Sequence, residues 1–167
     1  MPPHIDTFIR FLVQLARMLD KIESCDDESS SILSASLAPD MMPLVTQVRV
    51  SANFPCRALC RSVGKDVISF ENSVDSYQGL KLQLRESIHF LEQMKSETNY
   101  RQEAIVTDQA GQQEITLPIT DYFRQFVLPN FFFHIAMVYA IARQQGVPLS
   151  KGDFDGLHFY PVGFSFN

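Results

Sequence analysis

The stretch PNFFFHIAMVYAIARQQG, residues 129–146, is a long apolar run with two polar side chains inside it. Asn130 and His134 lie four positions apart, and no further amide or charged residue follows until Arg143. Residues at this spacing share one face of an α-helix, so the run predicts a core helix with a small polar cluster. Polar groups buried there must pair with each other, with water or with a ligand, because an unpaired buried polar group is costly.

Three further segments have the apolar periodicity of helices. Apolar residues recur every three or four positions with charged residues between them, and polar caps and glycines limit the segments. The four expected helices are 5–24, 41–63, 74–96 and 120–145. We expect Asp40 to cap the second helix. We also expect Pro55 and Pro129 to kink the second and fourth helices, because a proline inside a helix removes a backbone hydrogen bond.

Two short runs between the third and fourth helices alternate like strands. They flank Asp108-Gln-Ala-Gly111 and predict a hairpin at about 103–117. The tail, 147–167, is rich in Gly, Pro and Phe and is expected to pack as irregular chain over the bundle. Residues 1–167 are therefore predicted to form one all-α domain, a four-helix bundle with a small β-hairpin between the third and fourth helices.

Composition and charge exclude several classes of function. The net charge of −5 and the pI of about 5.3 argue against a nucleic-acid partner. The apolar N-terminal run is interrupted by Arg10 and is too short for a signal peptide or a membrane anchor. Three cysteines without a disulfide pattern favour a reducing, cytoplasmic setting. Cys56 and Cys60 are four apart on the second helix, a spacing that is only a weak signal for metal or redox chemistry.

Two stretches carry a resemblance to a known family. They are LAPDMMPLVTQV at 37–48 and LPNFFFHIAMVYAIARQQGVPLSKGDFDG at 128–156. They look like the uncharacterised DUF1993 family, part of the DinB/YfiT-like superfamily of four-helix proteins, and the resemblance extends from the first helix to about Gly156. Many members of that superfamily carry a three-histidine metal site, with one histidine from the second helix and two from the fourth. Some are thiol-dependent transferases or isomerases.

The resemblance places the three ligand positions at Gln47, Asn130 and His134, of which only the last is a histidine. Neutral amides bind divalent transition metals weakly, so no metal and no other cofactor is expected. The three side chains are interpreted as a former metal triad that now forms hydrogen bonds. Either they are a satisfied core network, or His134 is an imidazole that binds a ligand or works as an acid or base. Asp40, expected first as a helix cap, is a further candidate for substrate binding.

These residues support hypotheses from different classes. The first is a metal-independent isomerase, cyclase or lyase that acts on a small apolar molecule, of the kind found in biosynthetic pathways. His134 would be its acid or base, while Asn130 and Gln47 orient a carbonyl or enol oxygen. The second is a non-catalytic ligand-binding or structural interaction protein, and the third is a DinB-type metal-dependent transferase with a degenerate site. A cavity of a few hundred Å³ at His134 would favour the first over the second. No membrane partner is expected, and a homodimer through exposed helix faces is a further expectation.

Overall fold

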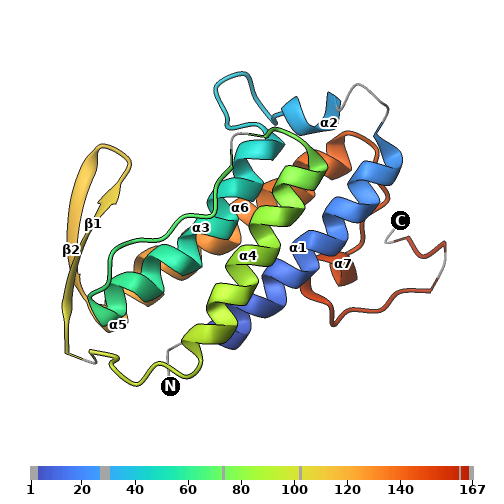
Figure 1. Ribbon diagram of the computed structural model, residues 1–167. Helices are drawn as coiled ribbons and strands as arrows, with labels where there is room; N and C mark the ends of the chain where they lie inside the picture. The colour runs from blue at the N-terminus through green and yellow to red at the C-terminus, as the bar shows by residue number, and fades with distance from the viewer. Residues whose placement is uncertain (1–3, 27–30, 73, 102, 162, 166–167) are drawn as a thin grey trace.

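Four long helices pack side by side as a bundle (Figure 1). The structure is a computed structural model that describes residues 4–26, 31–72, 74–101, 103–161 and 163–165, so the predicted domain limits at 1 and 167 lie outside it. The long helices are α1 (Ile5–Cys25), α3 (Leu44–Val63), α4 (Tyr77–Met94) and a final helix built from α5 (Ile119–Asp121), η1 (Tyr122–Val127) and α6 (Leu128–Gln144). In space α4 contacts both α1 and α3, and α6 contacts the same two helices from the other side. The predicted all-α bundle is confirmed.

The core forms where the apolar stripes of these helices meet. Each helix buries residues spaced three or four apart, the period that keeps them on one face. Phe8 of α1 and Phe131 of α6 illustrate the packing, with ring centroids 5.0 Å apart and nearly perpendicular rings. The final helix is long and apolar enough to cross a membrane by length and composition alone. Here it packs in the bundle and buries side chains such as Val138 and Ile141, so the described chain has the form of a soluble domain.

The second long helix begins three residues later than predicted. Asp40 lies exposed in a turn closed by Met41 N–H donating to Ala38 O, and α3 starts only at Leu44. The expected cap by Asp40 is therefore wrong. The reason is Pro43, since a proline disfavours helical backbone in the residue before it. The helix starts directly after the proline and runs without a break through Pro55.

The third long helix, α4, also begins later than predicted, at Tyr77 instead of 74. Ser76 caps it, because its Oγ accepts a hydrogen bond of 3.1 Å from Gly79 N–H. The final helix runs from 119 to 144, within a residue of the predicted 120–145, but contains a wide turn before Pro129.

That wide turn is η1, a π-helical segment. Leu128 N–H donates to Phe123 O, five residues back, where an α-helix would use the residue four back. Pro129 has no N–H to donate, so the backbone ahead of it loses a partner. The side chain of Asn130 also bonds to this turn, with Nδ2 donating a 2.7 Å hydrogen bond to Phe126 O, four residues back. The irregularity predicted at Pro129 takes the form of this widened turn.

The hairpin extends from one end of the bundle (Figure 1). Its strands, β1 (Ile105–Ala110) and β2 (Gln113–Pro118), are antiparallel and pair from Ile105 with Pro118 to Ala110 with Gln113. The predicted hairpin is present, but its turn is Gly111-Gln112, and Gly111 has a φ of 62°. Glycine takes this conformation without the steric cost that other residues meet. Asp108 is a strand residue paired with Ile115, not part of the turn as predicted.

Two short helices were not predicted. One is α2 (Ser31–Ser34), which packs on α3, and the other is α7 (Lys151–Asp155), which packs on α1. The tail is therefore not irregular throughout. Ser150 and Asp153 form a capping box at the start of α7, each side chain bonding to the backbone N–H of the other. The sequence contains this pattern, a serine followed three residues later by an aspartate, and the two hydrogen bonds stabilise even a short helix.

Candidate functional site

Gln47 and His134 meet between α3 and α6. His134 Nδ1 lies 2.7 Å from Gln47 Oε1, a hydrogen bond between residues 87 positions apart in the chain. Both side chains are buried, with 2% of Gln47 and 8% of His134 exposed. The family resemblance placed both residues at corresponding ligand positions and so predicted that they lie close together. The structure brings their side chains into direct contact.

The surrounding backbone fixes which imidazole nitrogen carries the proton. Gln47 Nε2 donates to Met42 O at 3.2 Å, and because a carbonyl can only accept, the amide oxygen must face His134. An amide oxygen also only accepts, so His134 Nδ1 must carry the hydrogen. Nε2 then keeps its lone pair, and no described residue hydrogen-bonds to it. Burial lowers the pKa of His134 from its ordinary value, so the imidazole is neutral near neutral pH.

Aromatic rings enclose the imidazole on two sides. Phe54 of α3 stacks on His134 with centroids 5.8 Å apart and an interplanar angle of 28°. The ring of Phe133 meets the imidazole edge-on with centroids 5.3 Å apart, and Phe133 is half exposed to solvent. Phe126, in the π-helical turn, contacts Phe54 at 5.6 Å. The widened turn thus contributes a ring to the apolar surroundings of the histidine.

Asn130 lies on the same helical face as His134 but bonds elsewhere. Its Nδ2 donates to Phe126 O within its own helix, and no hydrogen bond joins it to Gln47 or His134 among the described residues. Asp40 is exposed and likewise has no hydrogen bond to either residue in the described part of the chain. The predicted roles of Asn130 and Asp40 in substrate binding stay predictions. Neither of the two pockets described below is lined by His134.

A second polar cluster was missed by the sequence analysis. The side chain of Asp108 is fully buried, and its Oδ1 accepts hydrogen bonds from Arg57 and lies 2.9 Å from Arg61 Nη2. Its Oδ2 accepts from Tyr122 OH at 2.6 Å. Burial alone would raise the pKa of Asp108, but the hydrogen bonds from Arg57 and Tyr122 hold it below the ordinary value. The cluster joins the hairpin to α3 and η1. The sequence feature that could have indicated it is the pair Arg57 and Arg61, which lie four apart and therefore on one face of α3.

The cysteines of α3 lie in the core. Cys56 and Cys60 are free and buried, and burial raises the pKa of Cys56 to about 12. A thiol with so high a pKa carries almost no thiolate at neutral pH and is a poor nucleophile or metal ligand. Both residues behave as small apolar side chains of the bundle.

Comparison with solved structures defines the class of this fold. It is similar to the crystal structure of a DinB family member protein from Shewanella denitrificans, with a TM-score of 0.80 and 22% sequence identity, over 95% of this chain and 92% of that one. The chain is therefore a DinB-like helical bundle. More particularly, residues 3–155 match the family described as "Domain of unknown function (DUF1993)", and the chain belongs to that family. A comparison with curated proteins finds no match.

The side chains at the three corresponding positions do not fit a transition metal. They offer one imidazole and two amides, and each amide already donates to a backbone carbonyl. In the described residues no group of three or more His, Cys, Asp or Glu side chains gathers in a way that could hold an ion. Amide oxygens are weak ligands for zinc, nickel or iron. The donor set therefore disagrees with the metal site that the superfamily resemblance implies.

Proposed function

We propose that the chain binds a small, largely apolar molecule beside His134 and moves a proton on it without a metal, as an isomerase, cyclase or lyase does. The observation that carries the proposal is the fixed tautomer of the imidazole. A neutral histidine held with Nδ1–H on an acceptor presents the lone pair of Nε2, which is the form required of a general base. The phenyl rings of Phe54, Phe126 and Phe133 make the surroundings apolar.

In the proposed reaction Nε2 of His134 removes a proton from a carbon next to a carbonyl group. The C–H bond breaks, and its electrons pass into the enolate. The proton then returns from Nε2 to the same carbon, which is exchange, or to the γ carbon of a substrate whose C=C bond makes the enolate a dienolate, which is isomerisation. Gln47 is a positioning residue, since it holds the imidazole through Nδ1. Asn130 uses one amide N–H for Phe126 O, and its second N–H is the group proposed to bind the carbonyl oxygen as negative charge develops there.

The test uses phenylacetone as a small apolar ketone with exchangeable protons. Incorporation of deuterium from D₂O is followed by NMR for the wild type and for His134→Gln, with His89→Gln as the matched control. His89 is an exposed histidine of α4, and among the described residues its side chain hydrogen-bonds to Gln93 alone. We expect His134→Gln to lose about 100-fold or more of the enzyme-dependent exchange, and His89→Gln to retain it. Equal rates in wild type and His134→Gln would refute an acid–base role.

A non-catalytic role is the second candidate, and one observation favours it. Both amides have backbone partners, Met42 O for Gln47 and Phe126 O for Asn130, as in a core network that fixes two helices. A double variant with His134→Phe and Asn130→Leu distinguishes a ligand-binding site from a purely structural network. If the site serves a ligand, the double variant keeps its free energy of unfolding within about 2 kcal/mol and loses the thermal stabilisation by small ketones. A double variant that unfolds, beside a wild type that binds none of them, supports the structural role.

A further inference from the structure

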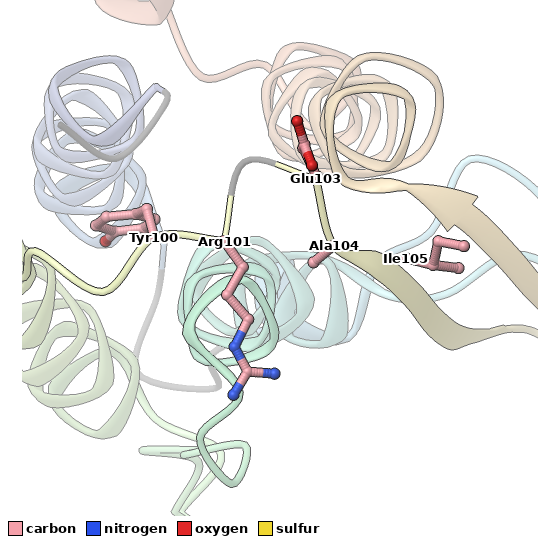
Figure 2. Close-up of a pocket in the computed structure, with 5 residues that line it drawn as sticks. All are labelled: Tyr100, Arg101, Glu103, Ala104 and Ile105. Atoms are coloured by element: carbon pink, nitrogen blue, oxygen red, sulfur yellow. The ribbon is translucent and has the colours of Figure 1, made fainter.

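A pocket at the C-terminal end of α3 has no part in the proposed function. This cavity of about 290 Å³ lies where α3 meets the chain that enters the hairpin, and it is lined by three cationic residues, Arg61, Lys65 and Arg101. An adjoining cavity of about 650 Å³ is drawn in Figure 2 and is lined by Tyr100, Arg101, Glu103, Ala104 and Ile105. Because Arg101, Ala104 and Ile105 line both, the two cavities form one depression.

The guanidinium of Arg101 lies against the backbone of Gly64. A Cβ at Gly64 would come within 2.5 to 2.8 Å of three guanidinium atoms, so only glycine allows this close approach. In Figure 2 the Arg101 side chain points to the end of α3, while the carboxylate of Glu103 points away from it. Within the described part of the chain, no hydrogen bond or ion pair uses the five N–H donors of this guanidinium, and Arg101 bonds only through its backbone.

The end of α3 does not need Arg101 as a cap. The last carbonyls of a helix lack partners within the helix and attract cations. Here Lys65 N–H donates to Cys60 O at 2.9 Å, and the backbone N–H of Arg101 donates to Ser62 O at 3.3 Å. Backbone groups thus already bind these carbonyls, and the guanidinium is left for another acceptor.

The pocket also has more positive than negative charge, in a chain whose net charge is −5. Arg61 shares the single carboxylate of Asp108 with a second arginine, and Arg61 Nε is buried without a hydrogen-bond partner. Lys65 is balanced by Glu97, whose carboxylate lies 2.5 Å from Nζ. The arginine pair therefore leaves one positive charge, Arg101 adds a second, and Glu103, which lines the larger cavity, supplies one negative charge, so the depression has an excess of one positive charge.

We propose that this depression binds the phosphate or carboxylate group of a small organic anion, with Arg101 as its principal contact. The planar guanidinium binds such oxyanions through two parallel hydrogen bonds. The body of the ligand lies along the larger cavity against Tyr100 and Ile105, and Ile105 is a large apolar residue that is 71% exposed. The inference is independent of the function proposed for His134, which does not line either cavity.

The experiment titrates the full chain with phenyl phosphate and with phenylacetate, using benzyl alcohol as the uncharged comparison. Backbone amide NMR shifts locate the binding site, and calorimetry gives the affinities. Arg101→Gln is the test variant. Arg85→Gln is its matched control, since Arg85 is an exposed arginine of α4 that lines neither cavity. Unfolding curves for both variants verify that each is folded.

We expect at least one of the two anions to shift the amides of Gly64, Lys65 and Thr107. Arg101→Gln should weaken that binding about tenfold or more, and Arg85→Gln should leave it within about twofold. The anion that binds more tightly identifies the ligand group as phosphate or carboxylate. Absence of binding up to about 10 mM would overturn the proposal. Equal affinity in Arg101→Gln, or benzyl alcohol binding as tightly as the anions, would also overturn it.

Discussion

Replacing Asp108 by alanine tests the cluster that fastens the hairpin to the bundle. The carboxylate is fully buried and serves two arginines and a tyrosine. Removing one partner of a buried ion pair costs about 3–5 kcal/mol, because the other charge is left unpaired. The side chains of Arg57 and Arg61 are 28% and 34% exposed, so water recovers part of that loss. Tyr122 is 1% exposed and loses its acceptor entirely.

Together these terms predict a loss of about 2–4 kcal/mol in the free energy of unfolding for Asp108→Ala. Urea titration followed by circular dichroism measures it, with Asp40→Ala as an exposed control expected within about 0.5 kcal/mol of wild type. A double-mutant cycle adds Tyr122→Phe. That change should cost about 1–2 kcal/mol in wild type and much less in Asp108→Ala, since its partner is already gone. Equal costs in the two backgrounds, or a loss below about 1 kcal/mol for Asp108→Ala, would refute this reasoning.

The same cluster makes the difference in free energy of unfolding between wild type and Asp108→Ala depend on pH, in a direction that can be predicted. The pKa of Asp108 is lowered in the folded chain despite burial, through its hydrogen bonds with Arg57 and Tyr122. A lowered carboxyl pKa stabilises the fold above the ordinary value of about 4, and the contribution is lost as the pH falls through the folded value. The stability gap between wild type and Asp108→Ala should therefore narrow in acid. A gap that widens below about pH 4 would contradict the assignment.

Three further changes are expected to alter stability in urea titrations. Gly64→Ala should cost about 1–2 kcal/mol, because φ is +70° there and the new Cβ meets the guanidinium of Arg101; an Arg101→Ala background should recover part of the loss. Burial lowers the pKa of His134 in the folded chain. Just below about pH 6.5 the imidazole therefore becomes protonated mainly in the unfolded chain, and the free energy of unfolding of wild type should fall as the pH drops. His134→Phe has no such group and should show a weaker dependence on pH. Ser76→Ala should cost about 1 kcal/mol, since Ser76 Oγ caps α4 through Gly79 N–H.

Helix periodicity predicted the bundle because burial of an apolar stripe is a property of each helix separately. The contact of Gln47 with His134 was reached through resemblance, since nothing local in either helix identifies a partner 87 residues away. Asp108 was misread for the opposite reason. Its local sequence, followed by Gln-Ala-Gly, suits a turn, and only its burial against Arg57 and Arg61 makes a carboxylate favourable inside a strand.

The late start of α3 was a competition between two local signals. Asp40 is a good capping residue, but Pro43 restricts the residue before it to extended backbone, and the steric effect prevailed. The tautomer of His134 could not be predicted, because it depends on Met42 O accepting from the Gln47 amide. Such a contact follows from how the loop before α3 closes on the helix.

The π-helical turn before Pro129 has a consequence for how sequences in this family change over time. A turn closed by a bond to the fifth residue accommodates one residue more than an α-helical turn. Losing one residue between Tyr122 and Val127 would restore an α-helical turn without rotating either flank. Tyr122 would still face Asp108, and His134 would still face Gln47. In an alignment of relatives, a single-residue gap in the final helix belongs at this turn.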